Sequence, residues 1–186
     1  METALLQSVV TAVLASGAAG ALPRMPWQLG LRRREQWQVQ AIYPEATALW
    51  TELSARSPDT AFDGDTSLLM PLRDYLLTQR EGSRPELTVL SNALACGCFG
   101  GHHLWQDLGV SDRSNVSQLL ATAFPPLHAS NVHNLRWKRH LFACLGEHLS
   151  RGELRPPKCA GCEDFTVCFG AAPIDERTSW RIGVAP

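Results

Sequence analysis

The most regular helical pattern in the chain is NLRWKRHLFACLGEHLS, residues 134–150. Its apolar side chains recur at the three- and four-residue spacing of an amphipathic α-helix and share one wide face, which carries Leu135, Trp137, Leu141, Phe142, Leu145 and Leu149. The opposite face carries Arg136, Arg139, Glu147 and Ser150. The pattern predicts a helix that buries one side against a core made largely of other helices.

Weaker helical patterns cover much of the rest of the chain. They lie at residues 2–19, 35–56, 67–80, 112–123 and from residue 87 onward, with a short helical turn at 104–108. We expect Ser111 to cap the 112–123 helix, and Pro125 and Pro126 to stop it. No segment alternates as a strand does, and 186 residues with 45% hydrophobic content suit a single domain. We therefore expect a mostly α protein. Its predicted parts are an N-terminal helix and basic connector at 1–34 and a helical domain at 35–186.

A group of cysteines follows the 134–150 pattern directly. The chain reads Cys159-Ala-Gly-Cys162 and, after five intervening residues, Cys168-Phe-Gly. Pro156 and Pro157 cannot continue a helix, so we predict a cysteine-rich loop at 154–170. A Cys-x-x-Cys turn lets two sulfurs reach one metal, which favours a metal or iron–sulfur site. The alternatives are a structural zinc knot, which would make the chain a zinc-stabilised helical interaction module, and a redox-active thiol pair, which would make it a thiol oxidoreductase.

The loop offers fewer ligands than ordinary closed sites use. Structural zinc and cubane clusters usually take four, and the loop has three cysteines. Cys144 lies on the preceding helix between His140 and His148, one turn away on either side, and is the first candidate for a fourth ligand. His148 is the second candidate. Alternatively, Cys144 is a small buried hydrophobe.

A second group of possible soft-metal ligands lies earlier in the chain. Cys96-Gly-Cys98 precedes His102-His103 closely enough for a shared metal, but the two cysteines could equally be small residues at a helix end.

Charge and hydropathy exclude several classes of function. The net charge is −1, and the 112–123 pattern carries Arg113 as its only cation, so we expect no nucleic-acid partner. The N-terminal apolar stretch lacks a basic n-region, and Gln7, Ser8 and Thr11 interrupt it. We therefore expect a cytoplasmic protein with no membrane segment.

Four motifs in the second half resemble the NifQ family of nitrogen-fixation proteins. In order, they are His103-Leu-Trp-Gln-Asp-Leu-Gly109, Phe124-Pro-Pro-Leu127, Asn134-Leu-Arg-Trp-Lys-Arg139 and the cysteine motif from Cys159 to Gly170. The resemblance covers roughly residues 90–172. It implies a cytoplasmic carrier, not a turnover enzyme, that holds molybdenum within an iron–sulfur cluster. Its implied partners are molybdate and the proteins that assemble the iron–molybdenum cofactor of nitrogenase.

The resemblance also bears on the ligands. The family pattern is Cys-x4-Cys-x2-Cys-x5-Cys, and its last three cysteines match Cys159, Cys162 and Cys168. Leu154 occupies the first position and cannot ligate, so either the site uses three thiolates or another residue substitutes, with Cys144 as the first choice and His148 as the second. Molybdate is an anion, and we expect the nearby cations to attract it: Arg136, Lys138, Arg139, Arg151, Arg155 and Lys158.

Overall fold

The computed structural model describes residues 3–23, 41, 44 and 62–170. Within those ranges the regular structure is helical and includes no strand, which confirms the expected mostly α fold. None of the helices in the described ranges is long and apolar enough to cross a membrane.

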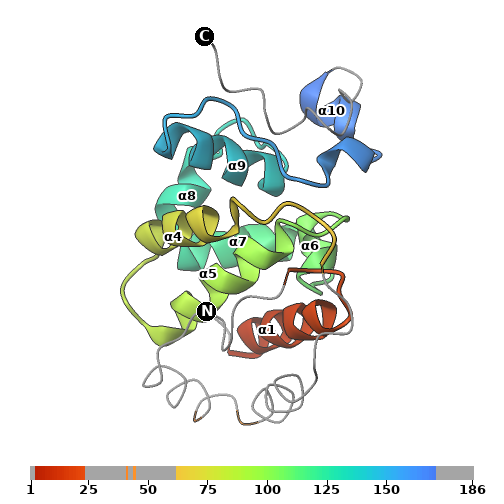
Figure 1. Cartoon of the computed structure of the whole chain (residues 1–186). Helices are drawn as coiled ribbons and strands as arrows, with labels where there is room; N and C mark the ends of the chain where they lie inside the picture. The colour runs from red at the N-terminus through yellow and green to blue at the C-terminus, as the bar shows by residue number, and fades with distance from the viewer. Residues whose placement is uncertain (1–2, 24–40, 42–43, 45–61, 171–186) are drawn as a thin grey trace.

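The core is built around α5 (Pro85–Gly97), which is buried continuously from Leu87 to Gly97. Pro85 occupies its first turn, where a missing backbone donor is harmless. The amphipathic N-terminal helix α1 (Thr3–Ala18) packs against α5 and buries Val9, Val10 and Val13. On another side of α5 lies α4 (Leu69–Gln79) (Figure 1). The structure therefore confirms the helices predicted at residues 2–19, at 67–80 and from residue 87 onward.

Four further helices lie between α5 and the cysteine segment in the described ranges. They are α6 (Leu104–Asp107), α7 (Arg113–Ala123), α8 (Pro125–Ser130) and α9 (Trp137–His148). The strongest sequence pattern forms α9, which packs against α4, while α7 packs against α6 and α8.

Two helix ends differ from the sequence prediction. The residue that caps α7 is Asp112 and not Ser111, because the Asp112 carboxylate accepts a hydrogen bond from the Asn115 backbone nitrogen at 3.1 Å. The prolines at 125 and 126 were expected to stop a helix. They also begin α8, since proline is favoured in a first turn.

The cysteine segment, residues 154–170, is more regular than predicted. Cys159 begins a 3₁₀ turn, η2 (Cys159–Gly161), and Cys168 lies on a short helix, α10 (Phe165–Phe169). The expectation of a loop without regular structure is therefore wrong for these two positions. Pro156 and Pro157 cannot continue a helix, but they do not prevent the residues after them from forming a 3₁₀ turn and a short helix. Figure 1 shows α10 at the edge of the molecule, beyond α9.

Some sequence predictions fall outside the described residues. The basic connector at 24–34 and nearly all of the helical pattern at 35–56 lie there. The predicted division of the chain after residue 34 also remains a prediction.

Candidate metal centre

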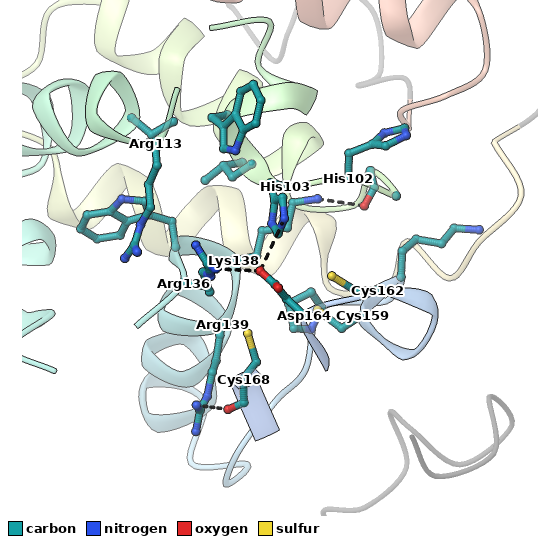
Figure 2. Close-up of a pocket in the computed structure, with 18 residues that line it drawn as sticks. His102, His103, Arg113, Arg136, Lys138, Arg139, Cys159, Cys162, Asp164 and Cys168 are labelled. Carbon is teal, nitrogen blue, oxygen red and sulfur yellow. Dashed lines mark hydrogen bonds and ion pairs between the residues drawn. The ribbon is translucent and has the colours of Figure 1, made fainter. Parts of the chain in front are cut away.

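Cys159, Cys162 and Cys168 line one pocket (Figure 2). Its other walls come from residues 100–105, which join α5 to α6, from α7 and from the first turn of α9. The pocket encloses about 660 Å³ of empty space with its open mouth included. The three thiols that the sequence grouped therefore face a common space together with side chains that are distant in sequence.

Asp164 links the cysteine segment to the helical body. Its Oδ2 lies 2.8 Å from a guanidinium nitrogen of Arg136 at the start of α9 and 3.5 Å from Nε2 of His103 at the start of α6. Arg139 adds a hydrogen bond to the carbonyl oxygen of Cys168. Polar contacts thus hold the cysteines over the pocket.

Cations and aromatic rings make a second set of attachments. The guanidinium groups of Arg155 and Arg139 lie 4.8 and 5.0 Å from the centre of the Phe169 ring. The Lys158 ammonium donates to the Asp63 carbonyl at 2.7 Å and lies 5.6 Å from the Phe62 ring. Several cations near the pocket therefore have a structural role as well as a charge.

Lys138 differs from the sequence expectation. We expected its ammonium to belong to a basic approach for molybdate, but the side chain is only 10% exposed and is paired with Asp107. The Asp107 side chain packs closely against Gly100, which follows α5. A Cβ at position 100 would come within 2.3 Å of the Asp107 Cγ. Lys138 is therefore part of the pocket floor.

The protein environment disfavours free thiolates. Burial raises the pKa of Cys159 to about 12, against the opposing charge of Lys138. Burial also raises the pKa of Cys168, whereas the charges of Arg136 and Arg139 act to lower it. In the absence of metal these two thiols stay protonated at neutral pH. The cations would favour the thiolate form once a metal displaces the protons.

The chemistry of the donors suits a soft metal or an iron–sulfur unit, since three thiols share one pocket. Across the part of the chain that is described, however, no three His, Cys, Asp or Glu side chains converge closely enough to hold one ion. Binding would therefore have to draw the cysteines together.

The two proposed substitutes for the missing cysteine lie elsewhere. Cys144 Sγ is 3.5 Å from Nε2 of His140, and its thiol also hydrogen-bonds Tyr75. The His148 ring lies 5.1 Å from the Tyr75 ring. Neither Cys144 nor His148 lines the pocket, so their assignment as ligands stays a prediction that the structure does not support.

The earlier cysteine pair is part of the helical core. Cys96 and Cys98 are buried at the end of α5 and are absent from the pocket lining, whereas His102 and His103 contribute to it. Burial raises the pKa of Cys98 to about 12, as expected for an inert core thiol.

Sequence reasoning missed three pocket residues. His103 was considered only with the Cys96 pair, and neither Asp164 nor Arg113 was considered at the metal site. Asp164 could have been noticed because it lies between two of the cysteines. His103 begins the first motif of the family resemblance.

Fold and pocket together define a helical protein with a cysteine-lined candidate metal centre. Comparison with known proteins identifies its family. The family model for NifQ matches residues 6–170, which is most of the chain. The chain therefore belongs to the NifQ family, as its motifs predicted.

Individual relatives agree with this assignment. Protein NifQ of Azotobacter vinelandii is 40% identical over 100 residues, which cover 54% of this chain and 51% of the relative. Protein NifQ of Klebsiella pneumoniae is 31% identical over 138 residues, which cover 64% and 81%. A NifQ homolog of Sinorhizobium fredii is 33% identical over 100 residues, which cover 54% and 44%.

The chain thus spans about half the length of two of these curated relatives. No solved structure matches it. Membership of the family implies a role in nitrogen fixation.

Proposed function

We propose that this chain carries molybdenum together with iron and sulfide, and donates it for assembly of the iron–molybdenum cofactor of nitrogenase. Cys159, Cys162 and Cys168 are the proposed ligands. The observation that carries the proposal is that these three cysteines, which match the family spacing, line one cation-rimmed pocket. The chain acts as a carrier, with molybdate and the cytoplasmic cofactor-assembly proteins as its partners.

The donor atoms suit this cargo. Thiolates are soft ligands, and they bind iron–sulfur units in preference to hard ions. Because the site has three thiolates and not four, the cargo would be held less permanently than in a closed four-cysteine site, which suits a donor.

The pocket cations suit the incoming molybdate. Arg113, Arg136, Arg139 and Lys158 line the pocket, and Asp164 is the carboxylate that shares it with them. A concave surface with an excess of positive charge concentrates anions. Arg151 was expected to contribute, but it lies outside the pocket lining and is exposed.

The other two functions receive different degrees of support. A thiol oxidoreductase needs a thiol of lowered pKa, whereas burial raises that of Cys159. A zinc-stabilised interaction module remains the second candidate, because His103 shares the pocket with the three cysteines and three cysteines with one histidine form an ordinary zinc set.

A growth experiment tests the proposed function. In a nitrogen-fixing strain without its own family member or a redundant carrier, the wild-type chain should restore growth on N₂ at limiting molybdate. A variant with all three pocket cysteines changed to Ser should fail, and excess molybdate should rescue it by mass action. Normal growth of the deletion strain at limiting molybdate would contradict the donor function.

The cations have a matched control in the same experiment. The Arg136→Gln variant should need more molybdate than wild type for equal growth. The Arg151→Gln variant should behave as wild type, because this arginine lies outside the pocket. Equal molybdate requirements in the two variants would contradict the proposal that the pocket cations attract molybdate.

A further inference from the structure

We propose that His103 is the fourth donor of the metal centre, which would join three sulfur atoms and one nitrogen atom. The inference rests on the proposed metal-binding function and identifies the residue that completes the site. Three observations support it: the side chain at position 154, the places of the other possible donors, and the contacts of His103 itself.

Position 154 cannot supply the missing ligand. A four-coordinate site on Cys159, Cys162 and Cys168 needs one more donor. The family resemblance expects a cysteine at 154, but the residue is Leu154, whose side chain packs against the hydrophobic core. The fourth donor must therefore come from another part of the pocket.

Most other sulfur and nitrogen donors face elsewhere. Cys144 and His148 contact His140 and Tyr75 and do not line the pocket. Cys98 is fully buried in the helical core. His102 also borders the pocket, but its side chain is 72% exposed and its Nδ1 lies 3.3 Å from Asp107.

His103 has the right position. Its side chain is 28% exposed and lines the pocket from the start of α6, and its backbone nitrogen donates to Gln106 Oε1 at 3.0 Å. Nε2 lies 3.5 Å from Oδ2 of Asp164, a residue within the cysteine segment. In Figure 2, Asp164 lies between His103 and the cysteines, with His103 directed toward the segment that carries the thiols.

Asp164 would have the role that carboxylates often have beside a metal-bound histidine: because it contacts Nε2 of His103, the metal would bind the other ring nitrogen, Nδ1. Such a partner orients the imidazole ring, and its loss commonly weakens metal binding. Arg136 holds the carboxylate at 2.8 Å, so the ring, the carboxylate and the guanidinium form one connected group. The contact between His103 and Asp164 already joins the two parts of the protein that metal binding must draw together.

Cadmium is a suitable probe, because it is a soft diamagnetic ion and needs neither iron nor molybdenum. The full reduced chain, labelled with ¹⁵N in histidine, is titrated with ¹¹³Cd²⁺. We expect a ¹¹³Cd signal typical of three sulfurs and one nitrogen, with scalar coupling to one histidine ¹⁵N. His133→Ala, which removes an exposed ring outside the pocket, should keep the coupling and the affinity.

Two substitutions at position 103 distinguish ligation from folding. His103→Ala should lose the coupling and bind Cd²⁺ at least about tenfold more weakly, since even partners of metal ligands contribute that much. His103→Cys should bind tightly, with the ¹¹³Cd signal moved to that of four sulfurs. Asp164→Asn should weaken binding but keep the nitrogen coupling.

Several results would overturn the inference. They are the absence of nitrogen coupling in wild type, equal affinities of His103→Ala and His133→Ala, and a coupling that persists in His103→Ala. If Asp164→Asn abolishes binding while His103→Ala preserves it, Asp164 is the donor instead. A chain that shows His103 coupling but never retains iron or molybdenum supports the donor set and contradicts only the proposed carrier function.

Discussion

The Lys138 ammonium nitrogen lies 2.5 Å from Oδ2 of Asp107, and both side chains are at most 10% exposed. The same ammonium donates to the Gly100 carbonyl at 2.8 Å. One buried ion pair therefore joins the first turn of α9 to the end of α6 and fixes the chain between α5 and α6. These are the parts of the body that face the cysteines.

Removing one partner of this pair should destabilise the metal-free protein strongly. Lys138→Met leaves a buried carboxylate without its counter-charge, so we expect a loss of about 3–5 kcal/mol in the free energy of unfolding. The double variant Lys138→Met/Asp107→Leu should recover part of that loss. Urea denaturation measures Lys138→Met, Asp107→Leu and the double variant, and a double variant as unstable as the sum of the two single variants would contradict the pairing.

Gly109 should be required for the docking of α1. It has a φ of +66°, and a Cβ there would lie 2.3 Å from Cβ of Ala12. Gly82 is a matched control, because its φ is +85° and nothing lies within 4 Å. Gly82→Ala should cost about 1–2 kcal/mol from backbone strain alone, and Gly109→Ala about 1–3 kcal/mol more. Equal costs in thermal or urea unfolding would mean that α1 does not pack there.

Arg136 should hold the cysteine segment in place without contributing much to global stability. The ion pair with Asp164 is partly exposed, so Arg136→Ala should change the unfolding free energy by less than about 1 kcal/mol. Hydrogen exchange of the Cys162 and Cys168 amides, which both donate within the segment, should nevertheless become faster. Arg151→Ala is the control, and equal exchange rates in the two variants would contradict the attachment.

The stability of the metal-free, reduced protein should fall in alkali partly through Cys159. Its folded-state pKa is raised from 9.0 to about 12, so the folded protein holds this proton more tightly than the unfolded chain does. The resulting stabilisation is complete below the unfolded pKa and is lost as the pH rises from 9.0 toward about 12.

Urea denaturation at two pH values tests this expectation. Between about pH 8 and pH 10.5, Cys159→Ala should lose less stability than wild type, because the titrating thiol is absent. Identical losses in the two proteins would show that the Cys159 thiol is not buried as described.

Local sequence patterns predicted much of this fold. The spacing of apolar residues around Leu141 and Leu145 located α9, and proline and glycine marked most helix ends. The helix stop predicted before Pro125 was correct, whereas the capping error at Asp112 came from a choice between two neighbouring residues that both suit a helix terminus. Each of these features depends on residues within a few positions of one another.

The pocket was only partly predictable, because its donors come from distant segments. The cysteines lie close in sequence and were found, whereas His103 is brought to Asp164 by the packing of α6 near α9 and the cysteine segment. The burial of Lys138 also depends on a partner more than thirty positions away, Asp107. The helical spacing correctly placed Cys144 on one face of α9 with His140 and His148. Local spacing could not predict that Cys144 contacts Tyr75 and not the cysteine segment, because that depends on how α9 packs against α4.

Metal analysis of the chain purified without oxygen tests the central claim most directly. We predict a brown protein that contains iron and molybdenum, and a colourless one when Cys159, Cys162 and Cys168 are all changed to Ala. Cys144→Ala, which removes a thiol outside the pocket, should keep both metals. Wild-type protein that contains zinc alone, or a triple variant that retains iron and molybdenum in full, would contradict the account.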